Sequence, residues 1–275
     1  MKVTDFHKMK QSGNKITMLT CYDYTSASLL ADMELDCLLV GDSVAMTMHG
    51  YQDTLSATID MMCYHTAAVR RGAGNQFIVT DLPFLSYRKS LSETMTMVQA
   101  MMQAGANAVK LEAAAGNLEM IRYLSESGVP VMGHLGLTPQ FVNALGGYKV
   151  QGKTEQAAKQ LAKDALALEK AGCFALVLEC VPRALAKSIT QTLAIPTIGI
   201  GAGPDTDGQV LVWQDLLGMN LAHQPKFVKK FMDGHGAIQR AIQHYLHEVK
   251  AGVFPDDEHC YRSECVANDP KNAVA

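Results

Sequence analysis

The sequence predicts an α/β protein folded as a single-domain (β/α)₈ TIM barrel. Short apolar segments alternate with segments of helical periodicity along most of the chain, which is typical of a parallel sheet. The length of 275 residues suits one barrel, which needs roughly 250 residues. Hydrophobic residues make up 48% of the chain and charged residues 19%, so a large core is available.

Eight apolar segments are the expected strands. They are too short for helices and too continuously apolar for strands with one face in water, so burial on both faces is expected. The segments are 16–22, 37–42, 77–82, 108–112, 131–136, 174–179, 195–201 and 209–214. The last is the weakest, and an open doubly wound sheet is therefore the alternative to a closed barrel.

Helical segments fill the intervals between the expected strands. They are 25–34, 58–72, 90–105, 117–128, 154–172 and 182–194. Ser90 with Glu93 predicts a capping box, and Asn117 and Thr154 are candidate N-caps. Pro182 suits the start of its helix, where a missing N–H costs little.

The chain reads as one barrel domain over residues 1–260 and a polar tail over 261–275. A net charge of −3 argues against nucleic-acid and membrane partners, and no apolar segment approaches the ~18 residues of a membrane span. The seven Cys form no C-x-x-C pair, and the N-terminus has no apolar signal core. We therefore expect reduced thiols in a cytoplasmic protein.

Acidic residues stand at the ends of several expected strands, where barrels carry their active sites. Asp42, Asp81, Glu112 and Glu179 follow or end strands two, three, four and six, and His134 lies in strand five. Four carboxylates on one rim repel one another, and a bound divalent cation relieves that repulsion. An oxygen donor set without Cys or paired His favours Mg²⁺ over Zn²⁺.

Lys110 stands two residues before Glu112, so both side chains are expected on one face of the strand. We predict an ion pair between them inside the barrel, placed to meet an anion. The glycine-rich segment 199–204 lacks the dinucleotide-binding spacing and is expected to be an anion-holding turn after strand seven. Segment 146–153 lacks P-loop spacing and is expected to be a long loop, a lid after strand five.

Longer motifs run through these residues and continue beyond them. They include TCYDY (20–24), LLVGDS (38–43), YHTAAVRRGA (64–73), AGANAVKLE (104–112), VPVMGHLGLTPQ (129–140), LVLECVP (176–182) and IPTIGIGAG (195–203). Over roughly residues 1–260 the chain resembles the ketopantoate hydroxymethyltransferase family, and contiguous matches of this length are highly specific.

The resemblance implies roles for residues already singled out. The positions that match the family's Mg²⁺ ligands are Asp42, Asp81 and Glu112. The positions that match its 2-oxo acid contacts are Asp42, Ser43, Asp81 and Lys110. Glu179 matches the proton acceptor, and His134 is a further substrate-binding candidate.

The resemblance also implies a reaction and an assembly. The family transfers a hydroxymethyl group from 5,10-methylenetetrahydrofolate, a co-substrate, to 3-methyl-2-oxobutanoate, with one Mg²⁺ per subunit in a homo-oligomer, a decamer. The main alternative is a Mg²⁺-dependent 2-oxo acid lyase or mutase of the phosphoenolpyruvate mutase and isocitrate lyase type. A barrel that only binds an organic acid is a second alternative.

Overall fold

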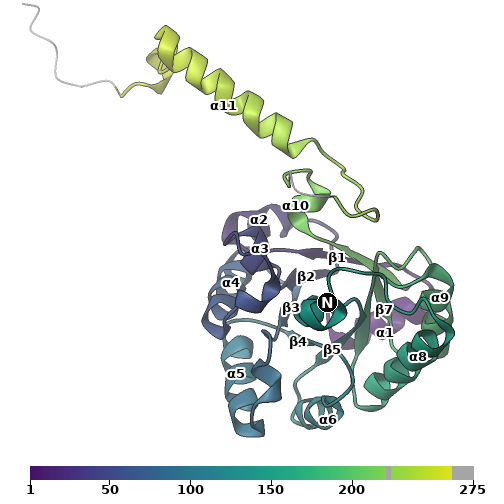
Figure 1. The fold of residues 1–275 in the computed structure, drawn as a ribbon. Helices are drawn as coiled ribbons and strands as arrows, with labels where there is room; N and C mark the ends of the chain where they lie inside the picture. The colour runs from purple at the N-terminus through teal and green to yellow at the C-terminus, as the bar shows by residue number, and fades with distance from the viewer. Residues whose placement is uncertain (221–223, 262–275) are drawn as a thin grey trace, which may run out of the picture.

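The fold is a closed barrel, and the computed structural model describes residues 1–220 and 224–261 of it. Parallel strands pair in chain order, and the eighth pairs with the first (Figure 1). The strands are β1 (Ile16–Thr20), β2 (Cys37–Val40), β3 (Phe77–Asp81), β4 (Ala108–Glu112), β5 (Val131–Gly136), β6 (Ala175–Glu179), β7 (Thr197–Ile200) and β8 (Gly208–Leu211). The predicted (β/α)₈ barrel is confirmed, and the open sheet is wrong.

Helices surround the barrel, and along the chain they alternate with its strands (Figure 1). They are α1 (Val3–Ser12), α2 (Tyr24–Leu30), α3 (Val44–Thr47), α4 (Ile59–Gly72), α5 (Leu91–Gln103), α6 (Leu118–Glu126), α7 (Val142–Leu145), α8 (Glu155–Lys170), α9 (Arg183–Thr192), α10 (Trp213–Leu216) and α11 (Gly234–Ala251). Short 3₁₀ turns are η1 (Thr54–Ser56), η2 (Ser86–Arg88), η3 (Pro139–Phe141) and η4 (Asp257–His259). None of the described helices is long and apolar enough to cross a bilayer.

The structure differs from the predicted elements at the start and at the end of the barrel. Helix α1 was not among the expected elements, because its residues carry few apolar side chains and only Phe6 is buried. The eighth strand ends at Leu211, and Trp213 begins helix α10 instead of extending the strand. Of the predicted polar tail, 261–275, residues 262–275 lie outside the described part of the chain.

Two of the predicted helix caps are confirmed. Ser90 Oγ accepts the Glu93 backbone N–H at 3.2 Å, and the Glu93 carboxylate accepts the Ser90 backbone N–H at 3.1 Å, which completes the capping box of α5. Thr154 Oγ1 accepts the Ala157 backbone N–H at 3.2 Å at the start of α8. These caps satisfy backbone donors that a helix leaves free at its first turn.

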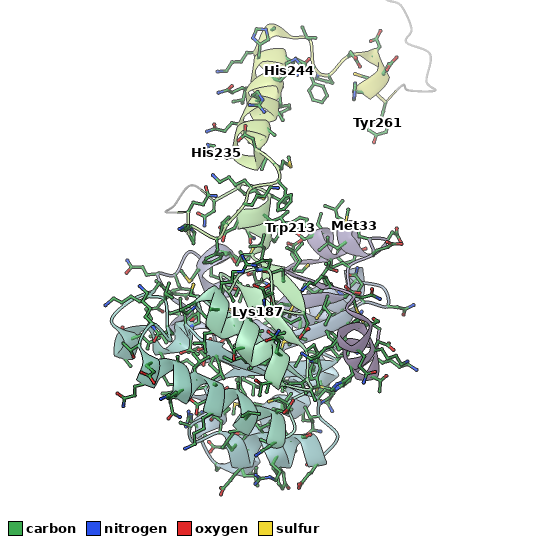
Figure 2. All side chains as sticks on the ribbon, turned by 90° about the vertical axis from the view of Figure 1, so that its right-hand side faces the viewer. Met33, Lys187, Trp213, His235, His244 and Tyr261 are labelled. Carbon is green, nitrogen blue, oxygen red and sulfur yellow. The ribbon has the colours of Figure 1, made fainter. Side chains whose placement is uncertain are left out.

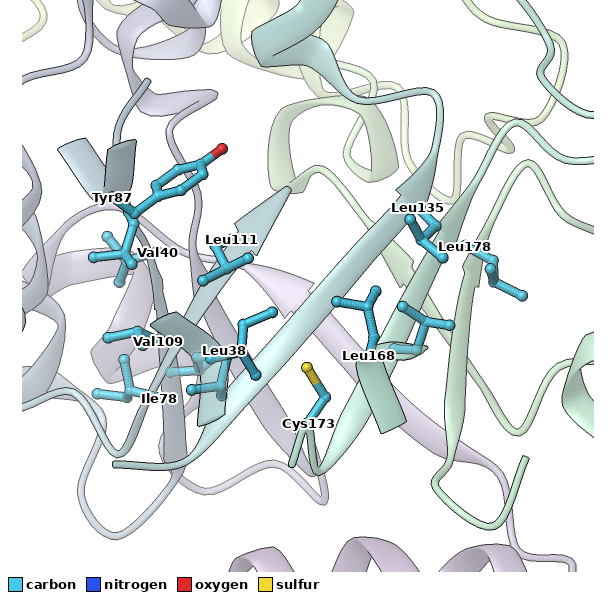
Figure 3. Packing of buried hydrophobic residues seen from close by; sticks show 14 of the residues in the cluster. Leu38, Val40, Ile78, Tyr87, Val109, Leu111, Leu135, Leu168, Cys173 and Leu178 are labelled. Atoms are coloured by element: carbon cyan, nitrogen blue, oxygen red, sulfur yellow. The ribbon is translucent and has the colours of Figure 1, made fainter. Parts of the chain in front are cut away.

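Apolar side chains form two layers on either side of the strands. The outer layer lies between strands and helices, and Figure 3 shows part of it, with Leu38, Ile78 and Val109 on strands and Leu168 on α8. The inner layer fills the barrel. Its members are Phe6, Ile16, Met18, Cys37, Leu39, Phe77, Val79, Ala108, Met132, Phe174, Ala175, Val177, Ile198 and Val210.

Helix α1 closes the N-terminal end of the barrel with a single aromatic side chain. The fully buried ring of Phe6 lies 5.2 Å from Phe77 and 5.3 Å from Phe174, measured between centroids, in edge-to-face contacts. Phe77 begins β3, and Phe174 immediately precedes β6. Edge-to-face pairs of this kind contribute beyond the area that they bury. Access to the barrel interior is therefore expected only from the opposite end.

Helix α11 extends away from the barrel (Figures 1 and 2). Only Gly234, at its first position, is buried. The helix nevertheless carries large exposed apolar side chains, which are Ile238, Ile242, Tyr245, Leu246 and Val249. Their spacing of three or four residues places them on one side of the helix. Within the described residues of its own subunit, this apolar stripe contacts the ring of Phe254, which lies 5.8 Å from that of Tyr245 between centroids, but it is not packed against either layer of the barrel core.

Candidate active site

Strand alternation brings the predicted site residues to the C-terminal end of the barrel interior. Polar residues stand two positions after residues of the inner layer in four neighbouring strands, as Asp81 follows Val79. Alternate residues of a strand face the same side, so the polar residues face inward as well. The residues placed in this way are Asp81 in β3, Lys110 and Glu112 in β4, His134 in β5 and Glu179 in β6.

Lys110 is the buried cation of the site, and its ion-pair partner differs from the prediction. Its Nζ lies 3.0 Å from Asp81 Oδ1, with both side chains about 5% exposed. The strand register sets Lys110 beside Asp81, because the two residues pair across β3 and β4. Glu112 lies on the same face of β4, as expected, but it does not form the ion pair with Lys110.

His134 connects the carboxylates of two strands. Its Nδ1 lies 3.4 Å from Glu112 Oε1 and 3.4 Å from Lys110 Nζ, while its Nε2 lies 3.3 Å from Glu179 Oε2. The buried Nε2 makes no well-directed hydrogen bond within the described residues. The Glu179 side chain is 17% exposed, whereas those of Glu112 and His134 are nearly inaccessible. Glu179 is therefore the carboxylate of this group that faces the open end.

Asp42 and Ser43 reach the site from the turn that follows β2. The backbone N–H of Asp42 donates to Asp81 Oδ2 at 3.1 Å, which ties this turn to β3. Ser43 Oγ lies 2.7 Å from the hydroxyl of Tyr22, which follows β1. A side chain on Gly41 would meet Ser43 Oγ at 2.8 Å, so only glycine fits between β2 and this turn. The tight turn fixes where Asp42 and Ser43 stand.

The electrostatics of the site follow from burial and crowded acids. Desolvation raises the pKa of Asp42 well above its usual range, and the charges of Asp81 and Glu112 raise it further. Burial alone would lower the pKa of Lys110, but the three carboxylates outweigh burial and raise it. One lysine therefore faces three acids, and the site carries an excess of negative charge when all are ionised.

His134 is also held toward its charged form. Burial and the neighbouring Lys110 lower its pKa, but the carboxylates of Glu112 and Glu179 close to its two ring nitrogens outweigh them and raise the pKa to about 9. A protonated imidazole between two carboxylates offsets part of their mutual repulsion.

The donor set fits a hard divalent cation. The three neighbouring carboxylates of Asp42, Asp81 and Glu112 supply oxygen donors only, and Asp81 Oδ1 makes no well-directed hydrogen bond. Among the described residues, no group of three or more His, Cys, Asp or Glu is already spaced around a metal position. Mg²⁺ needs only one or two carboxylates, because waters and substrate oxygens complete its shell.

A cavity of about 200 Å³ opens above these residues. Every predicted site residue lines it, namely Asp42, Ser43, Asp81, Lys110, Glu112, His134 and Glu179. Its remaining wall includes the side chains of Met46, Tyr148, Val212 and Phe227. Tyr148 belongs to segment 146–153, which follows β5 as expected, and its predicted role as a lid stays a prediction. The cavity joins a charged floor to a more apolar mouth.

Three polar residues that hydrogen-bond to Glu112, two of them to its backbone carbonyl, were missed by the sequence analysis. Gln140 and Tyr87 lie in the 3₁₀ turns η3 and η2, where no periodicity indicates which side chains turn inward. Asn117 occupies the predicted N-cap position of α6, but its side chain makes no capping hydrogen bond. Its Nδ2 donates instead to the backbone carbonyls of Glu112 at 2.8 Å and Ala113 at 2.9 Å. In the sequence, the only indication that Asn117 belongs to the site was its position five residues after Glu112.

The backbone is strained directly after two of the site carboxylates. Ala113 follows Glu112 with φ of 69°, and Cys180 follows Glu179 with φ of 47°. Residues with a Cβ rarely adopt this left-handed conformation, which costs of order 1 kcal/mol. Strain of this kind is concentrated at functional sites, and here it accompanies the ends of β4 and β6.

Structures of similar fold are known for other enzymes. A phosphonopyruvate hydrolase in complex with oxalate and Mg²⁺ aligns with a TM-score of 0.60 and 12% identity, covering 96% of this chain and 93% of that one. A 2,3-dimethylmalate lyase of the PEP mutase/isocitrate lyase superfamily aligns with a TM-score of 0.60 and 13% identity, covering 94% and 91%. Likeness at this identity establishes the barrel fold alone.

Sequence relatives are far closer. The 3-methyl-2-oxobutanoate hydroxymethyltransferase of Bdellovibrio bacteriovorus is 57% identical over 259 residues, which cover 94% of this chain and 98% of that protein. The enzyme of the same name from Francisella tularensis subsp. tularensis is 56% identical over the same coverage. The model of the ketopantoate hydroxymethyltransferase family matches residues 1–257. The chain therefore belongs to the ketopantoate hydroxymethyltransferase family.

Proposed function

We propose that this cavity transfers a hydroxymethyl group from 5,10-methylenetetrahydrofolate to 3-methyl-2-oxobutanoate, giving 2-dehydropantoate and tetrahydrofolate. The observation that carries the proposal is the meeting of Asp42, Asp81, Glu112 and Lys110 below the more exposed Glu179 in one cavity. Family membership and the names of the close relatives support the substrate and the reaction.

Asp42, Asp81 and Glu112 would hold one Mg²⁺ per subunit. Their crowding supports this assignment, because the ionised acids raise one another's proton affinity and a dication offsets that repulsion. When bound, Mg²⁺ supplies a Lewis acid that polarises the keto oxygen of a 2-oxo acid.

Lys110 and Ser43 bind the oxygens of the 2-oxo acid. The Lys110 ammonium is buried and paired with a single carboxylate, so it retains charge for the anionic substrate. Ser43 Oγ is held by the Tyr22 hydroxyl, which leaves the serine hydroxyl in a fixed place at the cavity wall. His134 lies between Lys110 and Glu179 and is a further substrate contact.

Glu179 removes the proton from C3 of the bound 2-oxo acid. Its carboxylate is exposed to the cavity, and His134 Nε2 at 3.3 Å restrains one of its oxygens. The electron pair left at C3 then forms the new bond to the one-carbon unit of the folate. Both C–N bonds that hold the one-carbon unit to the folate break, and water supplies the hydroxyl of the product. The two freed nitrogens of tetrahydrofolate take up the protons from C3 and from water.

Replacement of Glu179 tests this assignment. In the Glu179→Gln variant, exchange of the C3 proton of 3-methyl-2-oxobutanoate with D₂O, followed by NMR, should fall by a factor of roughly 10²–10⁴ because the base is lost. Mg²⁺ and substrate binding by calorimetry should persist. Glu169→Gln is the matched control, since Glu169 accepts backbone N–H groups of residues 194 and 195 at the closed end of the barrel.

The outcome separates this function from its alternative. Near-normal exchange in Glu179→Gln would remove Glu179 from the role of base. Turnover of 3-methyl-2-oxobutanoate should also require methylenetetrahydrofolate. Turnover of a 2-oxo acid without any folate would favour the lyase or mutase alternative, to which the barrel is related in fold.

We also propose that the protein acts as a cytoplasmic homo-oligomer. The resemblance to the family implies that this oligomer is a decamer. The apolar stripe of α11 supports association, because its residues are 43–54% exposed and contact no apolar surface of their own barrel. Large exposed apolar surfaces mark sites of protein association. Residues 1–260 then comprise the barrel domain together with this associating helix.

A further inference from the structure

Gln140 contacts the carboxylate cluster without being one of its charged members. It lies in the 3₁₀ turn η3 after β5, and its side chain is buried. We propose that Gln140 is a positioning residue that holds Asp42 and Glu112 in place for the cation and substrate. The inference rests on the proposed function of this site and adds a residue to which neither the sequence analysis nor the mechanism above gives a role.

Gln140 makes contacts to two carboxylates from different strands. Its Nε2 donates to Asp42 Oδ2 at 2.8 Å, and its backbone N–H donates to Glu112 Oε2 at 3.0 Å. Asp42 follows β2 and Glu112 ends β4, so a single residue after β5 spans much of the rim. Hydrogen bonds from an uncharged donor restrain both acids and leave their charge intact.

The orientation of the Gln140 amide is fixed by its other two partners. Nε2 also donates to the backbone carbonyl of Leu82 at 2.9 Å, and Oε1 accepts from the hydroxyl of Tyr87 at 2.7 Å. A flipped amide would set Oε1 against the Leu82 carbonyl and the Asp42 carboxylate, which are both acceptors only. Burial raises the pKa of Tyr87, so its hydroxyl stays protonated and remains a donor.

The network therefore runs from Tyr87 through Gln140 to Asp42. Each member has a defined donor direction, and every polar atom of the Gln140 side chain is occupied. Partners that orient the ligands of a metal typically affect its affinity by ~10–100-fold when removed. A residue that only filled space would leave metal affinity unchanged when replaced by an apolar side chain of similar size.

The test compares Gln140→Leu with the wild type in two assays. Calorimetry of Mg²⁺ binding in the absence of substrate should show an affinity at least roughly tenfold lower. Steady-state kinetics should show a raised KM for 3-methyl-2-oxobutanoate and a raised Mg²⁺ requirement. Tyr87→Phe removes the hydroxyl that orients the amide at 2.7 Å and that lies farther, at 3.5 Å, from the Glu112 backbone carbonyl. It should change both quantities in the same direction by less.

The double variant provides a stricter criterion. Because Tyr87 acts through Gln140, Gln140→Leu combined with Tyr87→Phe should bind Mg²⁺ no more weakly than Gln140→Leu alone. Tyr87→Phe keeps the buried ring, so it tests the network even if the leucine variant does not fold. Additive losses in the double variant would contradict a pathway through Gln140.

Gln76→Leu is the matched control for the loss of a buried amide. Gln76 Nε2 donates to the Leu30 carbonyl at 2.6 Å, and the residue precedes β3 at the closed end of the barrel. Its replacement should lower the thermal midpoint without altering Mg²⁺ affinity.

Two results would overturn the inference, and they are distinguishable. Wild-type Mg²⁺ affinity and KM in Gln140→Leu and in Tyr87→Phe, with only a lower thermal midpoint, would make Gln140 a structural residue while the proposed function stands. Failure of the wild type to bind Mg²⁺ would overturn the proposed function and this inference together.

Discussion

Each oxygen of the Asp81 carboxylate contacts a different group of the site. Oδ1 pairs with Lys110 at 3.0 Å, and Oδ2 accepts the backbone N–H of Asp42 at 3.1 Å. A neutral amide of the same shape removes the charge and keeps an acceptor for only one of these two groups, because its nitrogen can only donate. Replacement by asparagine therefore separates the electrostatic role of Asp81 from its packing.

Asp81→Asn should bind Mg²⁺ at least roughly tenfold more weakly, because a charged donor of the proposed site is lost. Calorimetry without substrate measures the effect. Asp207→Asn is the matched control, since Asp207 pairs with Lys10 at 2.8 Å near the N-terminal end of the barrel and lies outside the cavity. Unchanged Mg²⁺ affinity in Asp81→Asn would show that the proposed ligand set is wrong.

For single residues, the sequence predicted which side chains face the site better than it predicted which partners they contact. The alternation of strand residues predicted that Lys110 and Glu112 share a face, and the structure confirms it. The ion pair of Lys110 with Asp81 depends on the register between β3 and β4, which no single strand encodes. Gln140 belongs to a loop, and its inward orientation depends on tertiary partners alone.

Helix α5 illustrates how a short motif fixes an element. Its capping box joins Ser90 and Glu93 by reciprocal hydrogen bonds, and the Ser90 hydroxyl also donates to the Glu93 carboxylate at 2.6 Å. Hydrogen bonding to Ser90 also lowers the pKa of Glu93. Both residues are exposed and lie outside the cavity, so the cap affects stability without touching the chemistry.

Ser90→Ala should lower the free energy of unfolding by about 1 kcal/mol, because the first turn of α5 loses a side-chain acceptor. Urea unfolding followed by circular dichroism measures the change. Ser92→Ala, within the first turn of the same helix, is the control and should stay within about 0.5 kcal/mol of the wild type. Equal losses in both variants would mean that the cap contributes nothing specific.

Helices and strands with a strong apolar pattern of their own could be predicted from the sequence. Elements that form only because the sheet closes into a barrel could not. Strands β1 to β7 are continuous apolar runs, which indicate burial without reference to the rest of the chain. Strand β8 pairs with both β7 and β1, so its existence depends on closure of the sheet more than on its own four residues. Helix α1 has one buried residue, Phe6, and too little apolar periodicity to be recognised.

The whole molecule presents two separate surfaces, a catalytic mouth and the apolar stripe of α11. Helix α11 carries this stripe away from the barrel, as Figure 2 shows. The stripe is not part of the apolar core that the strands and helices of the barrel form among the described residues. If the stripe mediates assembly, as proposed above, its disruption should separate association from folding.

Ile242→Glu should dissociate the proposed oligomer or reduce its size, because a charge would be placed within an apolar contact. Sedimentation velocity measures the assembly, and circular dichroism checks that the fold is retained. Gln243→Glu introduces the same side chain beside the stripe and should leave the assembly unchanged. A wild-type protein that sediments as a monomer would show that α11 does not associate.

The aromatic closure by Phe6 also has a consequence for the order in which the chain assembles. Its two partners, Phe77 and Phe174, are distant in sequence, and the second lies more than halfway along the chain. During synthesis α1 emerges first, but the second of its two aromatic partners is not made until just before β6. Contacts of such long range form late, because ordering the intervening chain costs entropy first. The first helix to be made is therefore among the last to find its place.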